Sequence, residues 1–290
     1  MSRKRVVQSV LYCAALSTLA CSRRDTSSRA DVATDTAHLA TTSPRATDWA
    51  SELGQILVVP SDSDNSGVVL YPDDPSAQLL ASQGVTLVNA AGDTVRVKLI
   101  PSDSQECGEA PMVRFAGASR PSWSVGLLGR TARLLRMDSI EALPAADSAR
   151  LAADLARLAS GLATHQNSRF SGLPFVVLGA HRLQAGDRQF LIAHLVRRLN
   201  QEALPLEERT LIIAERAASS PTPEPYAVTY SQRSEGTEDT AEHFEVLAAV
   251  QGRSSPLLIF ARDQLSNTTY EILERAPEGW HARWSRTLSC

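Results

Sequence analysis

Short runs of β-branched and other hydrophobic residues, separated by polar turn residues, follow one another along most of this chain. After residue 50, this pattern predicts strands at 53–60, 67–71, 84–90, 94–100, 112–116 and 122–128. The segments between them contain clusters of Asp, Asn, Ser, Gly and Pro, which favour turns. We therefore expect an N-terminal β region over residues 51–140.

The second half of the chain has the pattern of an antiparallel meander. Its strands are predicted at 174–183, 188–199, 209–217, 225–233, 241–250, 256–263, 268–275 and 279–287. Two connections, at 185–187 and 277–279, are short and contain glycine, which is typical of β-hairpins. This spacing predicts a C-terminal antiparallel β-meander over residues 171–290.

Between the two β regions, one segment has the period of an α-helix. Leucine recurs there at positions 151, 155, 158 and 162. Asp147 or Ser148 is the expected N-terminal cap, and Gly161 with the polar residues after it ends the pattern. The sequence thus predicts a mainly β protein of the α+β class, with antiparallel sheets. Its one principal helix lies near 147–162, within a helical connector over 141–170.

A faint repetition runs through the meander. Residues 211–216 resemble residues 257–262 at an offset of 46, and residues 226–228 resemble 270–272 at an offset of 44. Periods of about 40–50 residues are typical of propeller blades, but two units do not close a ring. Amphipathic strands also resemble one another without any repeat, so we expect an open or sandwiched antiparallel sheet.

The first twenty residues have the composition of an export leader. Arg3, Lys4 and Arg5 form a basic head, and residues 6–20 are almost free of charge. A basic head, an apolar stretch of about 7–15 residues and small residues before a cleavage site are typical of a secretory signal. The stretch is shorter than the about 20 residues of a membrane-spanning helix. We therefore expect a signal peptide over residues 1–20.

The end of this leader, Leu-Ser-Thr-Leu-Ala-Cys at 16–21, resembles the lipobox of bacterial lipoproteins. The resemblance implies cleavage before Cys21 and a diacylglyceryl group on its sulfur. The lipobox usually has leucine three residues before the cysteine, where this chain has Thr18, so cleavage without a lipid or an uncleaved membrane anchor are the alternatives. Ser22, in place of aspartate after the cysteine, favours the periplasmic face of the outer membrane.

The residues after Cys21 have the composition of a tether. Residues 22–48 are rich in Ser, Thr, Ala and Asp and have no hydrophobic period. Such a segment buries too little apolar surface to offset the entropy of ordering it. We interpret residues 21–50 as a lipid-anchored flexible linker; a poorly ordered N-terminus without a spacing role is the alternative.

The charge balance excludes one class of partner. The whole chain carries 29 basic and 32 acidic residues, a net charge of −3. Removing residues 1–20 takes away three basic and no acidic residues, which leaves 26 − 32 = −6. Because nucleic-acid binding needs a basic face, we expect no nucleic-acid partner. Lysine occurs only at positions 4 and 98, and the remaining basic residues are arginine, as in proteins of high-GC genomes.

Two of the four cysteines are available for a disulfide. Cys13 lies in the leader and Cys21 is the expected lipid site, which leaves Cys107 and Cys290. In an oxidising periplasm these two thiols are expected to join. The bridge would close a loop of about 180 residues and stabilise the fold by roughly 4–5 kcal/mol.

One loop has the spacing of a calcium site. Asp62, Asp64 and Ser66 stand at loop positions one, three and five, Gly67 at position six and Asp73 at position twelve. This spacing resembles an EF-hand loop, in which oxygen atoms of alternate residues converge on the ion. The twelfth residue is Asp rather than Glu and the flanks are predicted strands, so a polar hairpin turn is the alternative reading. No other cofactor is expected.

The remaining polar residues form no catalytic motif. The six histidines are scattered, and the sequence contains no HExxH, GxSxG, SxxK or phosphate-binding loop. His194 alternates with hydrophobic residues and is interpreted as a satisfied or half-buried histidine of a sheet. Asp187, Glu202 and Glu208 lie near predicted loops and are interpreted as solvated turn residues.

Structural roles explain the large and the charged residues of the meander. Trp280 and Trp284 are expected on one face of a strand, either as core residues or as an exposed ligand platform. The dipeptides at 215–216 and 274–275, each Glu-Arg, close hydrophobic strands. Ion pairs between neighbouring strands explain them.

Two classes of function remain compatible with the sequence. The first is a non-enzymatic envelope lipoprotein whose β body binds a protein, a glycan or a small ligand, or has a role in assembly. The second is a periplasmic hydrolase with catalytic residues dispersed along the chain. A pocket that gathers His, a carboxylate and Ser would favour the enzyme, whereas an exposed aromatic patch would favour binding.

Overall fold

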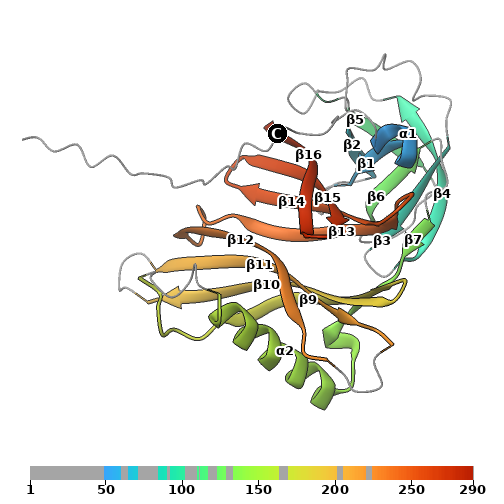
Figure 1. Ribbon diagram of the computed structural model, residues 1–290. Coiled ribbons are helices and arrows are strands. Elements are labelled where there is room, and N and C mark those ends of the chain that lie inside the picture. Colours follow the sequence, from blue (N-terminus) through green and yellow to red (C-terminus); the bar gives the residue numbers. More distant parts are fainter. Residues whose placement is uncertain are drawn as a thin grey trace, which may run out of the picture. The chain divides into compact units, whose positions relative to one another are not determined.

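The computed structural model describes most of the chain from residue 49 onward (Figure 1). The described residues are 49–59, 65–70, 84–89, 92–101, 110, 112–116, 123–128, 133–162, 169–200, 205–219 and 224–289. All of them belong to one compact unit, Thr42–Cys290. The described part is mainly antiparallel β-structure with one principal helix, which confirms the predicted fold class.

A small barrel follows a short helix, α1 (Trp49–Leu53). Its strands are β1 (Gln55–Val58), β2 (Ser66–Leu70), β3 (Gly84–Asn89), β4 (Thr94–Pro101), β5 (Met112–Ala116) and β6 (Trp123–Leu128). They close in the order β1-β2-β5-β4-β3-β6. Hydrophobic side chains such as Leu57, Val85 and Phe115 fill the interior. Because side chains alternate along a strand, the residues between them lie on the outer face of the barrel.

The rest of the chain forms two five-stranded antiparallel sheets. The first, here the helix-side sheet, has the order β12-β11-β10-β9-β8, and the second, the barrel-side sheet, has the order β16-β15-β14-β13-β7. Their strands are β7 (Arg133–Leu135), β8 (Met137–Ser139), β9 (Val176–Ala185), β10 (Arg188–Leu199), β11 (Leu206–Ala217), β12 (Ala227–Thr237), β13 (His243–Gln251), β14 (Pro256–Gln264), β15 (Asn267–Ala276) and β16 (Gly279–Ser289). The predicted meander is therefore divided between two sheets. Residues 133–139 join them, since β7 pairs with β13 and β8 pairs with β9.

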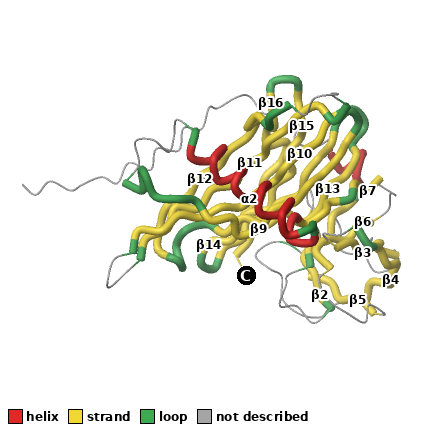
Figure 2. Tube along the Cα trace, turned by 90° about the horizontal axis from the view of Figure 1, so that it is seen from below, coloured by secondary structure: helices red, strands yellow, loops and turns green. Residues whose placement is uncertain are grey.

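The two sheets stack and are covered on their outer faces. Hydrophobic residues of both sheets, including Phe190, Ile213 and Phe260, form a core between them. Helix α2 (Ala145–Ser160) follows the 3-10 turn η2 (Ile140–Ala142) and packs Leu155 and Ala159 against the helix-side sheet (Figure 2). Both faces of the central strands are thus buried, which explains the eight consecutive buried residues within β10.

The barrel covers the outer face of the barrel-side sheet. The core at this junction includes Trp49, whose ring lies 5.4 Å from that of Trp284 on β16. The Glu52 carboxylate accepts hydrogen bonds from the guanidinium of Arg283, at 2.8 Å, and from the backbone amide of Arg253. Ser124 Oγ donates to the backbone oxygen of Leu247 at 2.7 Å. Hydrophobic and polar contacts together therefore fix the barrel on the sheet.

Two sequence predictions about local geometry are wrong. Pro144 rather than Asp147 or Ser148 precedes the first turn of α2, without a side-chain cap, and Asp147 instead binds Arg150 within the helix. Trp280 and Trp284 lie on opposite faces, in the core between the sheets and the core against the barrel respectively. The reason is an irregularity in the pairing of β15 with β16, which reverses the side-chain alternation between the two tryptophans. Their interpretation as core residues is confirmed.

The repeated sequence segments have no equivalent positions in the two sheets. Residues 211–216 lie on β11, the third strand of the first meander, whereas 257–262 lie on β14, the second strand of the other. The similarity therefore reflects a shared strand pattern.

Glu208 is fully buried, so its interpretation as a solvated turn residue is wrong. Its carboxylate accepts hydrogen bonds from Arg197 at 2.8 and 3.0 Å and forms an ion pair with Arg233 at 3.0 Å. The Arg197 guanidinium is itself buried and lies over the ring of Phe175. The buried charge is compensated by opposite charges, as the interior of a protein requires.

We expect Glu208→Ala to lower the free energy of unfolding by about 3–5 kcal/mol, because it removes the buried carboxylate to which Arg197 and Arg233 bind. The matched control is Asp154→Ala, which removes the exposed ion pair of Asp154 with Arg157. That variant should cost about 0.5 kcal/mol or less. Urea unfolding followed by circular dichroism measures both. Equal losses in the two variants would contradict the structural role of the buried pair.

Candidate functional site

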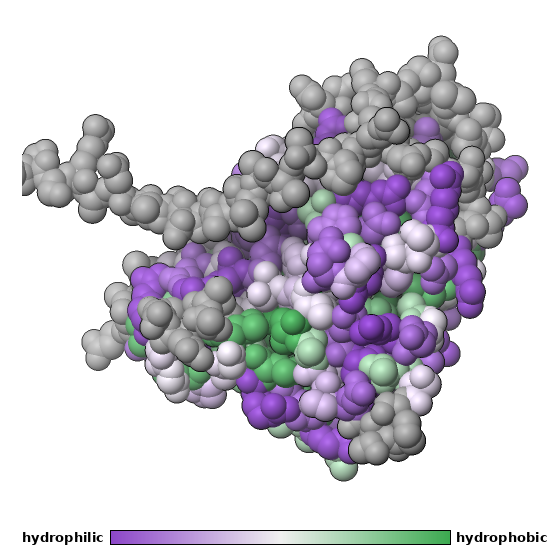
Figure 3. All heavy atoms as spheres, in the orientation of Figure 1, coloured by the Kyte–Doolittle hydropathy of each residue, from purple (hydrophilic) through white to green (hydrophobic). Residues whose placement is uncertain are grey.

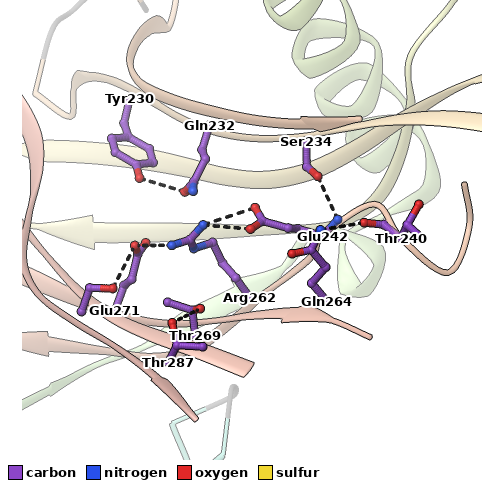
Figure 4. Close-up of polar contacts among 11 residues, drawn as sticks. Tyr230, Gln232, Ser234, Thr240, Glu242, Arg262, Gln264, Thr269, Glu271 and Thr287 are labelled. Carbon is purple, nitrogen blue, oxygen red and sulfur yellow. Dashed lines mark hydrogen bonds and ion pairs between the residues drawn. The ribbon is translucent and has the colours of Figure 1, made fainter. Parts of the chain in front are cut away.

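Polar residues of both sheets gather at one end of the space between the sheets (Figure 4). Arg262 on β14 lies at their centre. It donates hydrogen bonds to both carboxylate oxygens of Glu242, at 3.1 and 3.3 Å, and to Glu271 on β15 at 2.8 Å. Ser285 on β16 also donates to Glu271, at 3.4 Å. One guanidinium thus holds two carboxylates in place.

Strand β12 of the opposite sheet supplies the second wall of this arrangement. Tyr230 Oη donates to Gln232 Oε1 at 3.1 Å, and Ser234 Oγ accepts from the backbone amide of Glu242 at 2.9 Å. Figure 4 shows these three side chains on the strand above Arg262. We call the residues Tyr230, Gln232, Ser234, Glu242, Arg262, Glu271 and Ser285 the polar cluster.

An open hollow lies beside the polar cluster, with a volume of about 710 Å³. It is lined by Arg209, Glu238, Asp239, Ala241, His243, Asp263, Leu265 and Ser266. A hydrogen bond joins the two sides of the hollow. Gln264, which follows Asp263, donates from Nε2 to the backbone oxygen of Thr240, which precedes Ala241, at 3.0 Å. The connection between β12 and β13 and the turn between β14 and β15 therefore form the walls of one polar region.

Arg209 is held rigidly in the hollow. It donates to the buried Glu207 at 2.8 Å and to the backbone oxygens of Ala241 and Glu238 at 3.2 and 3.0 Å. Glu207 is also bound by Arg198, at 2.6 Å. Because each of its three side-chain nitrogens already donates to a partner, Arg209 is held in place and fixes the shape of the wall.

Leu265, at the edge of the hollow, has two unusual properties. Its side chain is 75 % exposed, and its φ of 54° lies in the left-handed region that bulky residues rarely adopt. Such strained positions cluster at functional sites, where the surrounding structure holds them in place. An exposed leucine beside polar walls offers an apolar contact to a ligand.

His194 and His243 meet at the inner side of the hollow. Their ring centroids lie 4.8 Å apart, and the buried Nε2 of His194 has no hydrogen-bond partner among the described residues. His194 lies in a sheet, as predicted, but it is only 6 % exposed and its Nε2 finds no partner in the described structure, so it is neither half-buried nor satisfied at this atom. Burial, and after it His243 and Arg209, lowers the pKa of the His194 imidazole to about 3. Burial and Arg209 also lower the pKa of His243, against a smaller opposing effect of Asp263.

Burial raises the pKa of two acidic groups of the polar cluster. It raises the pKa of Glu271, although the ion pair with Arg262 opposes the shift. Burial, with a further contribution from Glu271, also raises the pKa of Tyr230. The Tyr230 hydroxyl therefore remains protonated near neutral pH and acts as a hydrogen-bond donor.

Three residues of the hollow have the side-chain types of a serine-hydrolase triad. His243, Asp263 and Ser266 line the same hollow, but no hydrogen bond joins any two of them in the described structure. Asp263 instead accepts from Thr268 at 2.6 Å. A nucleophile needs an adjacent base within hydrogen-bond distance for activation. Among the described residues, no three His, Cys, Asp or Glu side chains are arranged to hold a metal ion.

Most of the site residues predicted from the sequence lie outside the described part of the chain. This holds for Cys21, Cys107 and Cys290, and for Asp62, Asp64 and Asp73 of the calcium-like loop. Ser66 is described, at the start of β2. The strands on both sides of this loop, β1 and β2, form an antiparallel pair, as a hairpin turn between them requires.

Sequence reasoning missed the polar cluster and the hollow. One signal was present: Arg262 follows Leu258 and Phe260 at alternate positions, so a charge occupies the inward face of a hydrophobic strand. Its partners are Glu271 on β15 and Glu242 just before β13, up to 20 residues away in the sequence, and no local pattern identifies them.

The described surface also carries hydrophobic residues away from the hollow. Val176 and Leu178 on β9 are 58 % and 42 % exposed. Figure 3 shows a compact hydrophobic patch on the half of the molecule that contains β9 and α2, whose surroundings are largely hydrophilic. Neither residue lines the hollow.

Comparison with known proteins does not assign a class to this chain. No protein-family model matches it, and no curated protein matches it. Among the described residues, no helix is long and apolar enough to cross a membrane.

We expect the free energy of unfolding to fall as the pH drops from about 6.5 towards 3, by about 1.4 kcal/mol per pH unit for each histidine that stays neutral in the folded state. The unfolded chain takes up a proton on His194 below its ordinary pKa, whereas the folded chain does so only near a pKa of about 3. His194→Gln should therefore flatten the pH dependence. Urea titrations across this range measure the slope, with His281→Gln as the control. Parallel curves for wild type and His194→Gln would contradict this assignment.

Proposed function

We propose that this protein is an exported envelope lipoprotein whose β body is a non-enzymatic binding module. The leader over residues 1–20 and the lipobox-like segment before Cys21 support export and anchoring. In this proposal the body faces the periplasm from the outer membrane. The oxidising compartment then allows Cys107 and Cys290 to form a disulfide.

The observation that carries the binding role is the hollow beside the polar cluster. Its edge presents the strained and exposed Leu265, and its walls present carboxylates, an imidazole and a hydroxyl. Arg262 and Arg209 are already bound to carboxylates or backbone oxygens, so the site is preformed before any ligand arrives. A rigid, mixed polar and apolar surface of this kind suits a protein or glycan partner.

A periplasmic hydrolase is the second candidate, and one observation favours it. His243, Asp263 and Ser266, the three residue types of a serine-hydrolase triad, line the same hollow. Hydrogen bonds of catalytic groups are often long without substrate and shorten when it binds. A reactive serine distinguishes this candidate from the binding module.

We expect labelled palmitate to enter the wild-type protein in cells and to be absent from Cys21→Ser. Only the cysteine at the cleavage site can carry the diacylglyceryl and amide-linked chains of a lipoprotein. Cys13→Ser, which changes the other cysteine of the leader region, is the matched control and should remain labelled. Equal labelling of Cys21→Ser and wild type would refute the proposed anchor.

We expect no reaction of the purified protein with a fluorophosphonate probe, since no described base forms a hydrogen bond that would activate Ser266. Gel fluorescence after labelling measures the reaction, with Ser266→Ala and Ser255→Ala as the paired variants. Labelling that disappears in Ser266→Ala and persists in Ser255→Ala would overturn the binding role in favour of the hydrolase.

A further inference from the structure

The outer face of the barrel carries three exposed cations on two neighbouring strands. Arg96 and Lys98 alternate with buried valine and leucine along β4, and Arg114 occupies an outward position on β5. Ile100 is the cross-strand partner of Arg114, and Lys98 that of Ala116. Directly opposed residues of antiparallel strands lie on the same face, and diagonal neighbours have their Cβ atoms about 7–8 Å apart. The three cations therefore share one surface, here the basic face.

These cations differ from most of the other described basic residues of the body, because they form no ion pair with any described residue. The described arginines of the sheets and of α2 are largely bound to carboxylates, as Arg197, Arg262 and Arg275 illustrate. In the described structure no ion pair involves Arg96, Lys98 or Arg114. Lys98 is also the only lysine that follows the leader. None of the described carboxylates thus compensates the charge of this face by a close contact.

An exposed hydrophobic residue lies within the basic face. Ile100 is 45 % exposed and stands directly opposite Arg114. A hydrophobic side chain among cations is the composition of surfaces that bind anionic membranes, where the cations meet headgroups and the apolar residue enters the interface. A soluble polyanion has no apolar layer in which the isoleucine side chain could be buried.

We propose that the basic face docks the barrel onto anionic lipid headgroups of the membrane to which the protein is anchored. This inference rests on the proposed function, because the lipid on Cys21 supplies the second attachment. The chain between Cys21 and Trp49 has 48 − 21 = 27 residues, residues 22–48. Fully extended, it spans at most about 95 Å. The first described element, α1, leads directly into the barrel, so the barrel is the part of the body tied nearest to the anchor.

The net charge of the body does not prevent this docking. The chain after the leader carries −6, which repels an anionic surface as a whole. At physiological ionic strength, charges are screened beyond about 8 Å, so the nearest groups dominate the interaction. Each cation near an anionic bilayer strengthens binding about 5-fold. Three cations on one face therefore outweigh acidic residues on distant faces.

The test measures vesicle binding without the lipid anchor. Residues 21–290 carrying Cys21→Ser contain the whole compact unit Thr42–Cys290 and all of the described core. This chain is sedimented with phosphatidylcholine vesicles that contain either no phosphatidylglycerol or about one third of it, in about 0.15 M salt. We expect binding to the anionic vesicles only, and loss of that binding in high salt.

Two triple variants separate the basic face from total charge. Replacing Arg96, Lys98 and Arg114 by alanine should weaken binding on the order of 100-fold. The matched control replaces Arg136, Arg150 and Arg157, which are exposed by 80, 71 and 68 % and lie elsewhere in the fold. It removes the same charge and should bind like the parent chain. Circular dichroism establishes that both variants are folded.

Three results would overturn the proposal: no preference for anionic vesicles, equal weakening by the two triple variants, or equally tight binding to a double-stranded oligonucleotide. The last result would identify a general polyanion site. Palmitate labelling of Cys21 is a separate measurement. Labelling without vesicle binding would refute the basic face alone, whereas vesicle binding without labelling would refute the anchor alone.

Discussion

The burial of both faces of the two central sheets is the constraint on which the rest of the structure depends. Helix α2 covers one sheet, the barrel covers the other, and a hydrophobic core lies between them. A charged side chain in the buried middle of these strands has no water on either side, so it must find its partner within the protein. Glu208 meets Arg197 within one sheet, and Glu215 meets Arg275 across the two sheets, at 2.6 and 2.9 Å. The interior charges are therefore part of the packing.

The same constraint confines functional chemistry to the ends of the sheets. Where the two sheets extend beyond the hydrophobic core, inward positions become polar, and Arg262 binds one carboxylate on β15 and another just before β13. The neighbouring hollow is open because a connection and a turn, rather than a third layer, border it. His194 marks the boundary, since its ring contacts Phe244 on one side and His243 of the hollow on the other. The site is a continuation of the core in which hydrogen bonds replace hydrophobic contacts.

The sequence predicted the strands well because their signals are local. Alternation, β-branched residues and glycine-containing turns located nearly every strand of the meander, and leucine spacing located α2. The division into two sheets depends on which strands pair over long distances, and no local pattern encodes it. One pairing irregularity reversed the expected faces of Trp280 and Trp284. The ion pairs expected between neighbouring strands are present, since Glu215 pairs with Arg188 and Glu274 with Arg283, each at 3.7 Å. Glu215 also binds Arg275 of the other sheet, which was not predicted, because alternation turns both side chains into the interior. The burial of Glu208 was not predicted for a related reason, because the composition of a segment near a loop does not show which side chains are buried.

The junction between barrel and sheet connects the two proposed activities. Trp49 packs against Trp284, and Glu52 binds both Arg283 and the backbone at Arg253, so the first described residues of the body are fixed to the sheet that carries Arg262. A barrel held by such contacts cannot rotate freely against that sheet, because rotation would expose a hydrophobic core and break an ion pair with little exposure to water. Any surface that fixes the orientation of the barrel therefore also fixes the direction in which the hollow opens. This rigidity favours binding by an anchored module, because less orientational entropy is lost when the site meets a partner.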